Sequence, residues 1–196
     1  MKQKDFDIVI VGAGIVGLSF ALELVNSEFS VAMVERHALD AIPDEVDCRV
    51  SAINRFALQR FQKAGVWQSP LARRVCAFER MFVWDQTGTG QIQFDSAEMG
   101  VSELGAIVEN NVLQTMLLAV VQAADNVTYY CPEEITSIDY QPSSAQGKST
   151  VTLSSGKQLS ASLLVGADGV NSKVREIAQI QRSHESYQQQ GLVCNV

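Results

Sequence analysis

The sequence DIVIVGAGIVGLSFALELV near the start of the chain places three glycines inside an otherwise almost wholly apolar run. Gly12, Gly14 and Gly17 have the spacing G-x-G-x-x-G. The β-branched residues 6–11 before them predict a strand buried on both faces of a parallel sheet. From Ile15 onward, apolar side chains recur at helical spacing. The run therefore predicts a strand, a tight glycine turn and a helix, in that order.

The same run does not fit a targeting or membrane-spanning segment. Lys2 and Lys4 make a weak basic start that Asp5 and Asp7 cancel at once, and no small-residue cleavage site follows. The glycines and Glu23 interrupt the apolar stretch, whereas a bilayer span needs about twenty consecutive apolar residues. We therefore expect a soluble chain.

Each glycine of the turn has a physical role in binding a dinucleotide. Gly12 permits the sharp turn out of the strand, Gly14 lets the main chain approach a pyrophosphate, and Gly17 lets the helix pack closely on the strand. The helix start at Ile15 presents unpaired N–H groups and the positive end of its dipole to the phosphates. The alternative is a glycine turn that serves packing alone.

An acidic residue stands where such a site requires one. Residues 30–35 predict a second buried strand, so that strand, turn, helix and strand make a βαβ unit. Glu35 ends this strand, 18 residues after Gly17. A carboxylate there accepts hydrogen bonds from a ribose 2′-hydroxyl and repels a 2′-phosphate. The unit alone does not distinguish FAD from NAD.

Composition argues against several classes of binding partner. The chain has 196 residues, 46% hydrophobic and 19% charged, with a net charge of −7. An acidic chain without a basic cluster argues against nucleic-acid binding and gives no attraction to anionic lipid. Its four cysteines form no C-x-x-C, and its two histidines lack a second ligand at metal-site spacing. We therefore expect no metal site. We also expect the cysteines to be reduced, as in a cytoplasmic protein.

Further elements follow from hydrophobic periodicity and turn signals. We expect the following, in chain order: a helix within 49–64, ended by Gly65; a β-hairpin over 78–95; a strand at 105–110; a helix over 111–123; strands at 127–130 and 134–141; a hairpin over 149–162 that turns at Ser155-Gly156; a buried strand at 163–169; a helix from an N-cap at Asn171 to about 180; and a strand beginning within 187–196. Because that last strand has no visible partner, we expect the chain to be the first part of something longer.

Several motifs together resemble one enzyme family. They are VIVGAGIVGLSFALEL, VERH, DCRVSAIN, VENNVLQTML and LLVGADGVNSKVR. In this order and spacing, from about residue 5 to 180, the chain resembles the aromatic-ring hydroxylases of the flavoprotein monooxygenase group, which includes p-hydroxybenzoate hydroxylase. It looks most similar to the ubiquinone-biosynthesis hydroxylases of that group.

The resemblance implies an α/β fold. A Rossmann-like FAD-binding βαβ domain with a mainly parallel sheet would be joined by a β-rich fragment of a substrate domain. The FAD-binding domain would comprise 1–77 and 101–180, and the substrate-domain fragments 78–100 and 181–196. The family's downstream Gly-Asp motif and its second half, which supplies most of the substrate pocket, have no counterpart in these 196 residues.

The resemblance also implies cofactor-binding residues. They are Gly12, Ala13, Gly14, Ile15 and Gly17 at the FAD pyrophosphate, Glu35 at the adenosine ribose, Arg36 beside the adenine, Arg49 on the flavin side, Gln114 near FAD, and Asp168 with Gly169 serving FAD and the transient visit of NAD(P)H.

Simpler alternatives remain open for three of these assignments. Arg49 could be a surface arginine, Gln114 a solvated first-turn residue, and Asp168-Gly169 a turn that caps the next helix. Asn111 stands where this branch of the family often has arginine; if that arginine supports a phosphate or the flavin, its charge is missing here and we expect a lower cofactor affinity.

The implied activity is hydroxylation of a polyprenylated phenol with O₂ in ubiquinone biosynthesis, through NAD(P)H-reduced FAD and a C4a-hydroperoxide. No catalytic residue is named, because those facing the substrate would lie mostly in the second half. The prenyl substrate would imply contact with the inner face of a membrane. Two other readings stay open: a remnant dinucleotide-binding chain without hydroxylase activity, and an FAD-dependent oxidoreductase of another kind.

Overall fold

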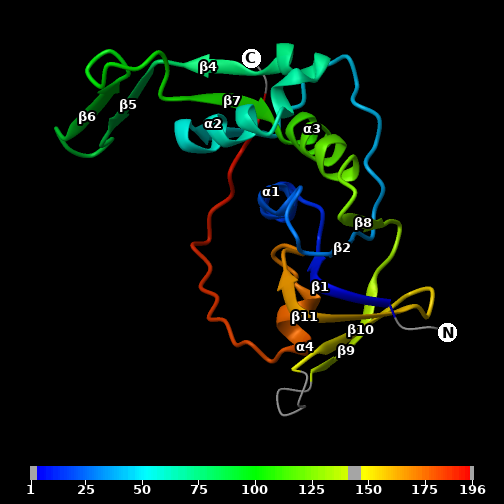
Figure 1. Ribbon diagram of the computed structural model, residues 1–196. Helices are drawn as coiled ribbons and strands as arrows, with labels where there is room; N and C mark the ends of the chain where they lie inside the picture. The colour runs from blue at the N-terminus through cyan, green and yellow to red at the C-terminus, as the bar shows by residue number, and fades with distance from the viewer. Residues whose placement is uncertain (1–3, 141–146, 195–196) are drawn as a thin grey trace. The chain divides into compact units, whose positions relative to one another are not determined.

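The computed structural model describes residues 4–140 and 147–194 (Figure 1). The chain divides into two compact units. The first comprises Met1–Ala41 and Leu117–Leu192, and the second comprises Ile42–Met116 and Val193–Val196. Helix α3 (Asn110–Gln122) begins in the second unit and ends in the first.

The first unit contains a six-stranded sheet with the order β8-β2-β1-β11-β10-β9. Its strands are β1 (Lys4–Val11), β2 (Val31–Val34), β8 (Val127–Tyr130), β9 (Ile135–Tyr140), β10 (Ser149–Leu153) and β11 (Gln158–Gly166). Strands β8, β2, β1 and β11 run parallel to one another, whereas β10 pairs antiparallel with both β11 and β9. This mixed α/β architecture with a mostly parallel sheet confirms the predicted fold class.

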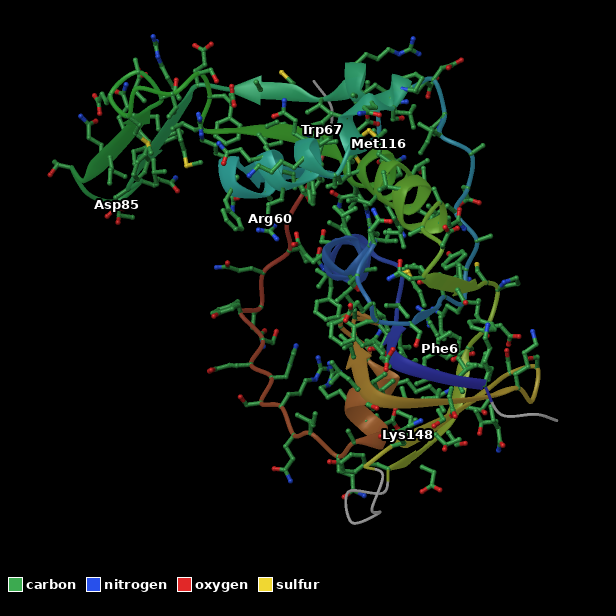
Figure 2. All side chains as sticks on the ribbon, viewed as in Figure 1. Phe6, Arg60, Trp67, Asp85, Met116 and Lys148 are labelled. Atoms are coloured by element: carbon green, nitrogen blue, oxygen red, sulfur yellow. The ribbon has the colours of Figure 1, made fainter. Side chains whose placement is uncertain are left out.

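The buried centre of this sheet explains the continuous apolar runs in the sequence. Every residue of β2 is buried, and so are the last four of β1, because parallel strands are covered on both faces. Helix α1 (Ile15–Leu24) buries Leu18 and Leu22. Phe6, labelled in Figure 2, lies on β1 with its ring edge-on to Tyr130 at 6.3 Å.

The second unit is built from short elements. Strands β3 (Val50–Asn54), β7 (Gly105–Glu109) and β4 (Cys76–Phe78) form an antiparallel sheet in the order β3-β7-β4. Helix α2 (Arg55–Lys63) and the 3₁₀ turns η1 (Val66–Gln68) and η2 (Pro70–Arg74) lie between β3 and β4. Strands β5 (Arg80–Trp84) and β6 (Gln91–Asp95) form the predicted hairpin, and Asp85 marks its turn in Figure 2.

One predicted helix is wrong over its first third. The helix expected within 49–64 begins only at Arg55, because residues 50–54 form β3 and pair antiparallel with β7. Asn54 ends the strand and caps the helix, its side chain accepting a hydrogen bond from the Ala57 N–H at 2.9 Å.

Three predictions near the end of the chain also need correction. The strand expected at 163–169 is the second half of one nine-residue strand, β11, and Leu163 in it is 49% exposed. Helix α4 (Lys173–Ile177) is capped by Ser172 rather than Asn171 and is shorter than expected. Residues 187–194 form no strand, and residues 195–196 lie outside the described part of the chain.

Within the described residues, no helix is long and apolar enough to cross a membrane.

Candidate functional site

Two glycines of the turn between β1 and α1 are required by the fold itself. Gly12 has a φ of +104°, and a Cβ on it would collide with the Ala167 carbonyl and lie 2.9 Å from the Asp168 Cα. A Cβ on Gly17 would collide with the carbonyl oxygen of Gly12. Both positions therefore need glycine whether or not a ligand binds.

Gly14 is different, because nothing within the protein requires a glycine there. Its φ of −68° is accessible to any residue, and a Cβ on it would have no atom of the described residues within 4 Å. Gly14 is also the N-cap of α1, beside the unpaired N–H groups of the first helical turn. The open space at Gly14 is the cradle expected where a phosphate approaches the main chain.

The Glu35 carboxylate lies against this turn. Its Oε2 accepts a hydrogen bond from the Ala13 N–H at 2.7 Å, and its Oε1 accepts one from the His37 N–H at 2.9 Å. Each carboxylate oxygen can accept a second hydrogen bond, so both retain a position for a hydroxyl donor. The structure thus brings Glu35 to the glycine turn. Arg36 follows it and is exposed.

Asp168 reaches the same place from the neighbouring strand. Because β1 and β11 are parallel, with Val11 opposite Gly166, their carboxyl ends meet. The Asp168 Oδ2 accepts hydrogen bonds from the Lys173 and Val174 N–H groups at 2.6 and 3.2 Å, so the helix-capping alternative is true of this oxygen. Its Oδ1 is buried and has no hydrogen-bond partner among the described residues.

Arg49 and Gln114 belong to the second unit. Arg49 is exposed and directly precedes β3, and its carbonyl accepts a hydrogen bond from the Asn110 N–H at 2.9 Å. Gln114 is half-buried on α3. The structure therefore brings Arg49 to the start of the helix that carries Asn111 and Gln114.

Tyr129 on β8 lies near Glu35, with Cys131 beside it, and neither residue was predicted from the sequence. Tyr129 is the third residue of β8, and Cys131 directly follows that strand. Burial raises the pKa of the Tyr129 hydroxyl, and the Cys131 thiol and the Glu35 charge raise it further. No periodicity or motif marks these residues, because Tyr129 comes near Glu35 only through the pairing of β8 with β2.

The geometry of the first unit fits the diphosphate and ribose of a dinucleotide. The open Gly14, the N–H groups at the start of α1 and the Glu35 carboxylate lie together, with an unpaired Asp168 oxygen on the neighbouring strand. Among residues 4–140 and 147–194, no three or more His, Cys, Asp or Glu side chains gather as a metal site.

A family model described as "FAD binding domain" matches residues 5–196. The chain belongs to this FAD-binding domain family. The match confirms the expected cofactor, FAD. The individual cofactor contacts expected from the sequence remain predictions.

Two curated relatives show which branch the FAD-binding chain is similar to. It is 33% identical over 183 residues to 3-demethoxyubiquinol 3-hydroxylase of Escherichia coli, covering 92% of this chain and 45% of the relative. It is 28% identical to ubiquinone biosynthesis monooxygenase COQ6 of Dictyostelium discoideum, covering 100% of this chain and 43% of the relative. The chain therefore spans less than half the length of these relatives. They confirm the resemblance to the ubiquinone-biosynthesis hydroxylases.

A solved structure supports the fold. The flavin-dependent monooxygenase PieE, determined in complex with FAD and substrate, superimposes with a TM-score of 0.70 at 17% identity, covering 92% of this chain and 33% of that one. At this identity the likeness concerns the fold alone.

Proposed function

We propose that the chain is the FAD-binding part of a flavin-dependent monooxygenase that hydroxylates a polyprenylated phenol in ubiquinone biosynthesis. The names of the two curated relatives support this substrate class. Bound FAD, reduced by NAD(P)H, would supply the chemistry that activates O₂. This chain's own residues would bind and orient the cofactor.

In this proposal the first unit holds the adenosine diphosphate half of FAD. The N–H groups at the start of α1 donate to the diphosphate, and Gly14 leaves room for it. Glu35 accepts hydrogen bonds from the ribose hydroxyls. Asp168 and Gly169, which follow the neighbouring strand β11, are further contacts in the proposal. Arg36 would lie beside the adenine, and Arg49 and Gln114 would serve the flavin side, as the family resemblance implies.

The β5–β6 hairpin would belong to the substrate domain, as the family resemblance implies. Its cross-strand pairs Met81–Phe94 and Val83–Ile92 are 42–51% exposed and form one wholly apolar face. A face of this kind needs a covering layer. We infer that chain following residue 196 in a longer protein supplies it. We also infer that a polyprenyl substrate brings the enzyme to a membrane surface.

One observation carries the proposal: Gly14 is a glycine that the fold does not need. An occupant outside the protein explains it, and the turn is shaped for a diphosphate. The test is FAD titration of the 196-residue chain, followed by flavin fluorescence. We expect binding by the wild type and affinity at least about tenfold weaker in Gly14→Ala, because the added methyl group displaces the phosphate from the N–H groups.

Gly191→Ala is the matched control. Gly191 also has no positive φ, and a Cβ on it would meet no atom within 4 Å in the part of the chain that the structure describes. We expect wild-type FAD affinity in Gly191→Ala, and a melting temperature within a few degrees of the wild type in both variants. Equal FAD affinity in Gly14→Ala and the wild type, or no FAD binding by the wild type, would contradict the proposal.

A further inference from the structure

Arg74 and Glu109 form a buried ion pair within the second unit. Glu109 ends β7 with a side chain that is 3% exposed, and Arg74 ends η2 with a side chain that is 14% exposed. The Arg74 Nε lies 2.7 Å from the Glu109 Oε1, and the Arg74 Nη2 lies 2.5 Å from the Oε2. Two parallel contacts of this kind fix the guanidinium group in one orientation.

The other hydrogen bonds of this pair hold the irregular segment before β3. Arg74 donates through Nη1 to the Pro43 carbonyl at 2.6 Å and through Nη2 to the Glu45 carbonyl at 2.9 Å. The Glu109 Oε2 accepts a hydrogen bond from the Asp47 N–H at 2.7 Å. The segment forms neither helix nor strand. The Arg74 and Glu109 side chains therefore supply backbone hydrogen bonds that a helix or a neighbouring strand would otherwise provide.

The held segment leads directly to Arg49. The Asp47 Oδ1 accepts a hydrogen bond from the Arg49 N–H at 3.1 Å. The Arg49 carbonyl accepts one from the N–H of Asn110, the residue after Glu109, at 2.9 Å. The backbone of Arg49 is therefore held on both sides by neighbours of the ion pair, while its side chain stays exposed.

Stability alone is a weak reason for such a pair. Taking both charges out of water costs free energy, and well-packed apolar side chains of similar volume often give equal or greater stability. Apolar side chains could not bind the carbonyls of Pro43 and Glu45 or the N–H of Asp47. The arrangement of the contacts therefore favours a positioning role.

We propose that Arg74 and Glu109 are positioning residues that preorganise the segment 43–49, so that Arg49 is set to contact the flavin side of the cofactor. The inference rests on the proposed function, because Arg49 needs a fixed position only if the chain binds FAD. A segment ordered in advance loses less conformational entropy on binding than a free one. Loss of the pair should therefore weaken FAD binding, although neither side chain is itself a cofactor contact in the proposal.

The first experiment replaces both charges with apolar groups. The variant Arg74→Met/Glu109→Leu leaves no unpaired buried charge, so we expect an apo melting temperature within a few degrees of the wild type. We expect its FAD affinity, measured by flavin fluorescence, to fall about tenfold. The control is Arg80→Met/Asp95→Leu, which removes another Arg–carboxylate contact of the second unit, 3.0 Å long, in the β5–β6 hairpin. We expect this control to keep wild-type FAD affinity.

The second experiment tests whether the pair acts through Arg49. Arg49→Ala should weaken FAD binding in the wild type but add little in the Arg74→Met/Glu109→Leu background, because residues that act together are not additive. A pair that only stabilises the unit would leave the Arg49→Ala effect at full size. Additive losses would therefore overturn the inference.

Trypsin cleavage of the apo protein gives a readout that needs no cofactor. We expect cleavage after Arg49 to be faster in Arg74→Met/Glu109→Leu, with cleavage after Arg36 unchanged. If that variant does not fold, Arg74→Lys keeps the charge beside Glu109 but not the bidentate geometry, and the same faster cleavage is expected. Unchanged cleavage after Arg49 would overturn the inference.

The two proposals fail in different ways. If the wild type binds FAD and Gly14→Ala weakens it, while the Arg74 variants keep full affinity, only the positioning role is wrong. If the wild type does not bind FAD, the proposed function is wrong, and the positioning role with it.

Discussion

The three glycines of the G-x-G-x-x-G motif are each explained by a different physical property. Gly12 needs its positive φ, Gly17 needs the absence of a Cβ against a neighbouring carbonyl, and Gly14 needs neither. A substitution at each position therefore tests a different property. Motif spacing alone cannot separate these reasons, because the collisions arise in the folded turn.

The first prediction concerns Gly17→Ala. The new methyl group would collide with the Gly12 carbonyl oxygen, so the turn or α1 must shift. We expect the free energy of unfolding to fall by about 1–3 kcal/mol or more, measured by urea denaturation. Gly14→Ala should lose only about 0.5–1 kcal/mol, because it replaces an N-cap glycine of α1 by a poorer N-cap residue without a collision. Equal losses in the two variants would contradict this account of the turn.

The second prediction concerns Glu133, whose N–H donates to the Glu35 carbonyl at 2.8 Å. Hydrogen bonds from Ser155 and Ser154 lower the pKa of the Glu133 carboxyl below its ordinary value of 4.5, and Lys157 adds to this. A carboxyl whose pKa is lower in the folded state contributes stability above its unfolded pKa and loses it as the pH falls through the folded value.

We therefore expect Glu133→Gln to lower the melting temperature at pH 7, with the difference from the wild type closing as the pH falls below about 4.5. Melting curves across this pH range measure the effect. A difference that stays constant with pH would show that the ionised form is not the stabilising one.

At the scale of elements, the boundary between β3 and α2 depends on one side chain. Asn54 ends the strand and caps the helix through its bond to the Ala57 N–H. We expect Asn54→Ala to cost about 1 kcal/mol in urea denaturation, and Asn54→Asp to retain the stability because aspartate caps equally well. Equal losses in both variants would show that the cap is not what Asn54 contributes.

The predicted elements that proved correct have local causes. The βαβ unit, the β5–β6 hairpin and α3 each carry their own periodicity or turn residues. The helix expected within 49–64 failed over 50–54 because antiparallel pairing with β7, more than fifty residues later, overrides a pattern that also fits a helix. The single strand β11 was divided in two for a similar reason, since its partners β1 and β10 decide its length.

The residues of the candidate site also differ in whether their contacts have local or long-range causes. Glu35 and the glycine turn could be predicted because the βαβ unit fixes their spacing within one short stretch. The ion pair of Arg74 with Glu109, and the approach of Tyr129 to Glu35, could not be predicted. Each of these contacts joins side chains from elements that meet only after folding, and no periodic pattern in the sequence marks either contact.

At the scale of the whole molecule, the chain holds a cofactor-binding family domain but spans less than half the length of its curated relatives. The apolar face of the β5–β6 hairpin is exposed, so this part of the proposed substrate domain has no covering layer among the described residues.

We expect the purified 196-residue chain to show no substrate-dependent NAD(P)H oxidation and no hydroxylated product, even with FAD bound. Product analysis by mass spectrometry measures this. FAD binding itself, followed by the flavin absorbance, serves as the control that the chain is folded. Clear turnover by the chain alone would disprove the view that a second half is required.

The pairing of β1 with β11 has a consequence for synthesis of the chain on the ribosome. Lys4 pairs with Leu159 and Val11 with Gly166, so β1 must wait for a strand made much later to pair on this side. Strands β9 to β11, by contrast, are consecutive and can assemble as soon as they emerge. Strand β1 can pair with β2 on one side early, but its other edge stays unpaired until β11 is made, and an open apolar edge of this kind is a segment that chaperones protect. Any message that stops before codon 166 would yield a glycine turn without its neighbouring strand.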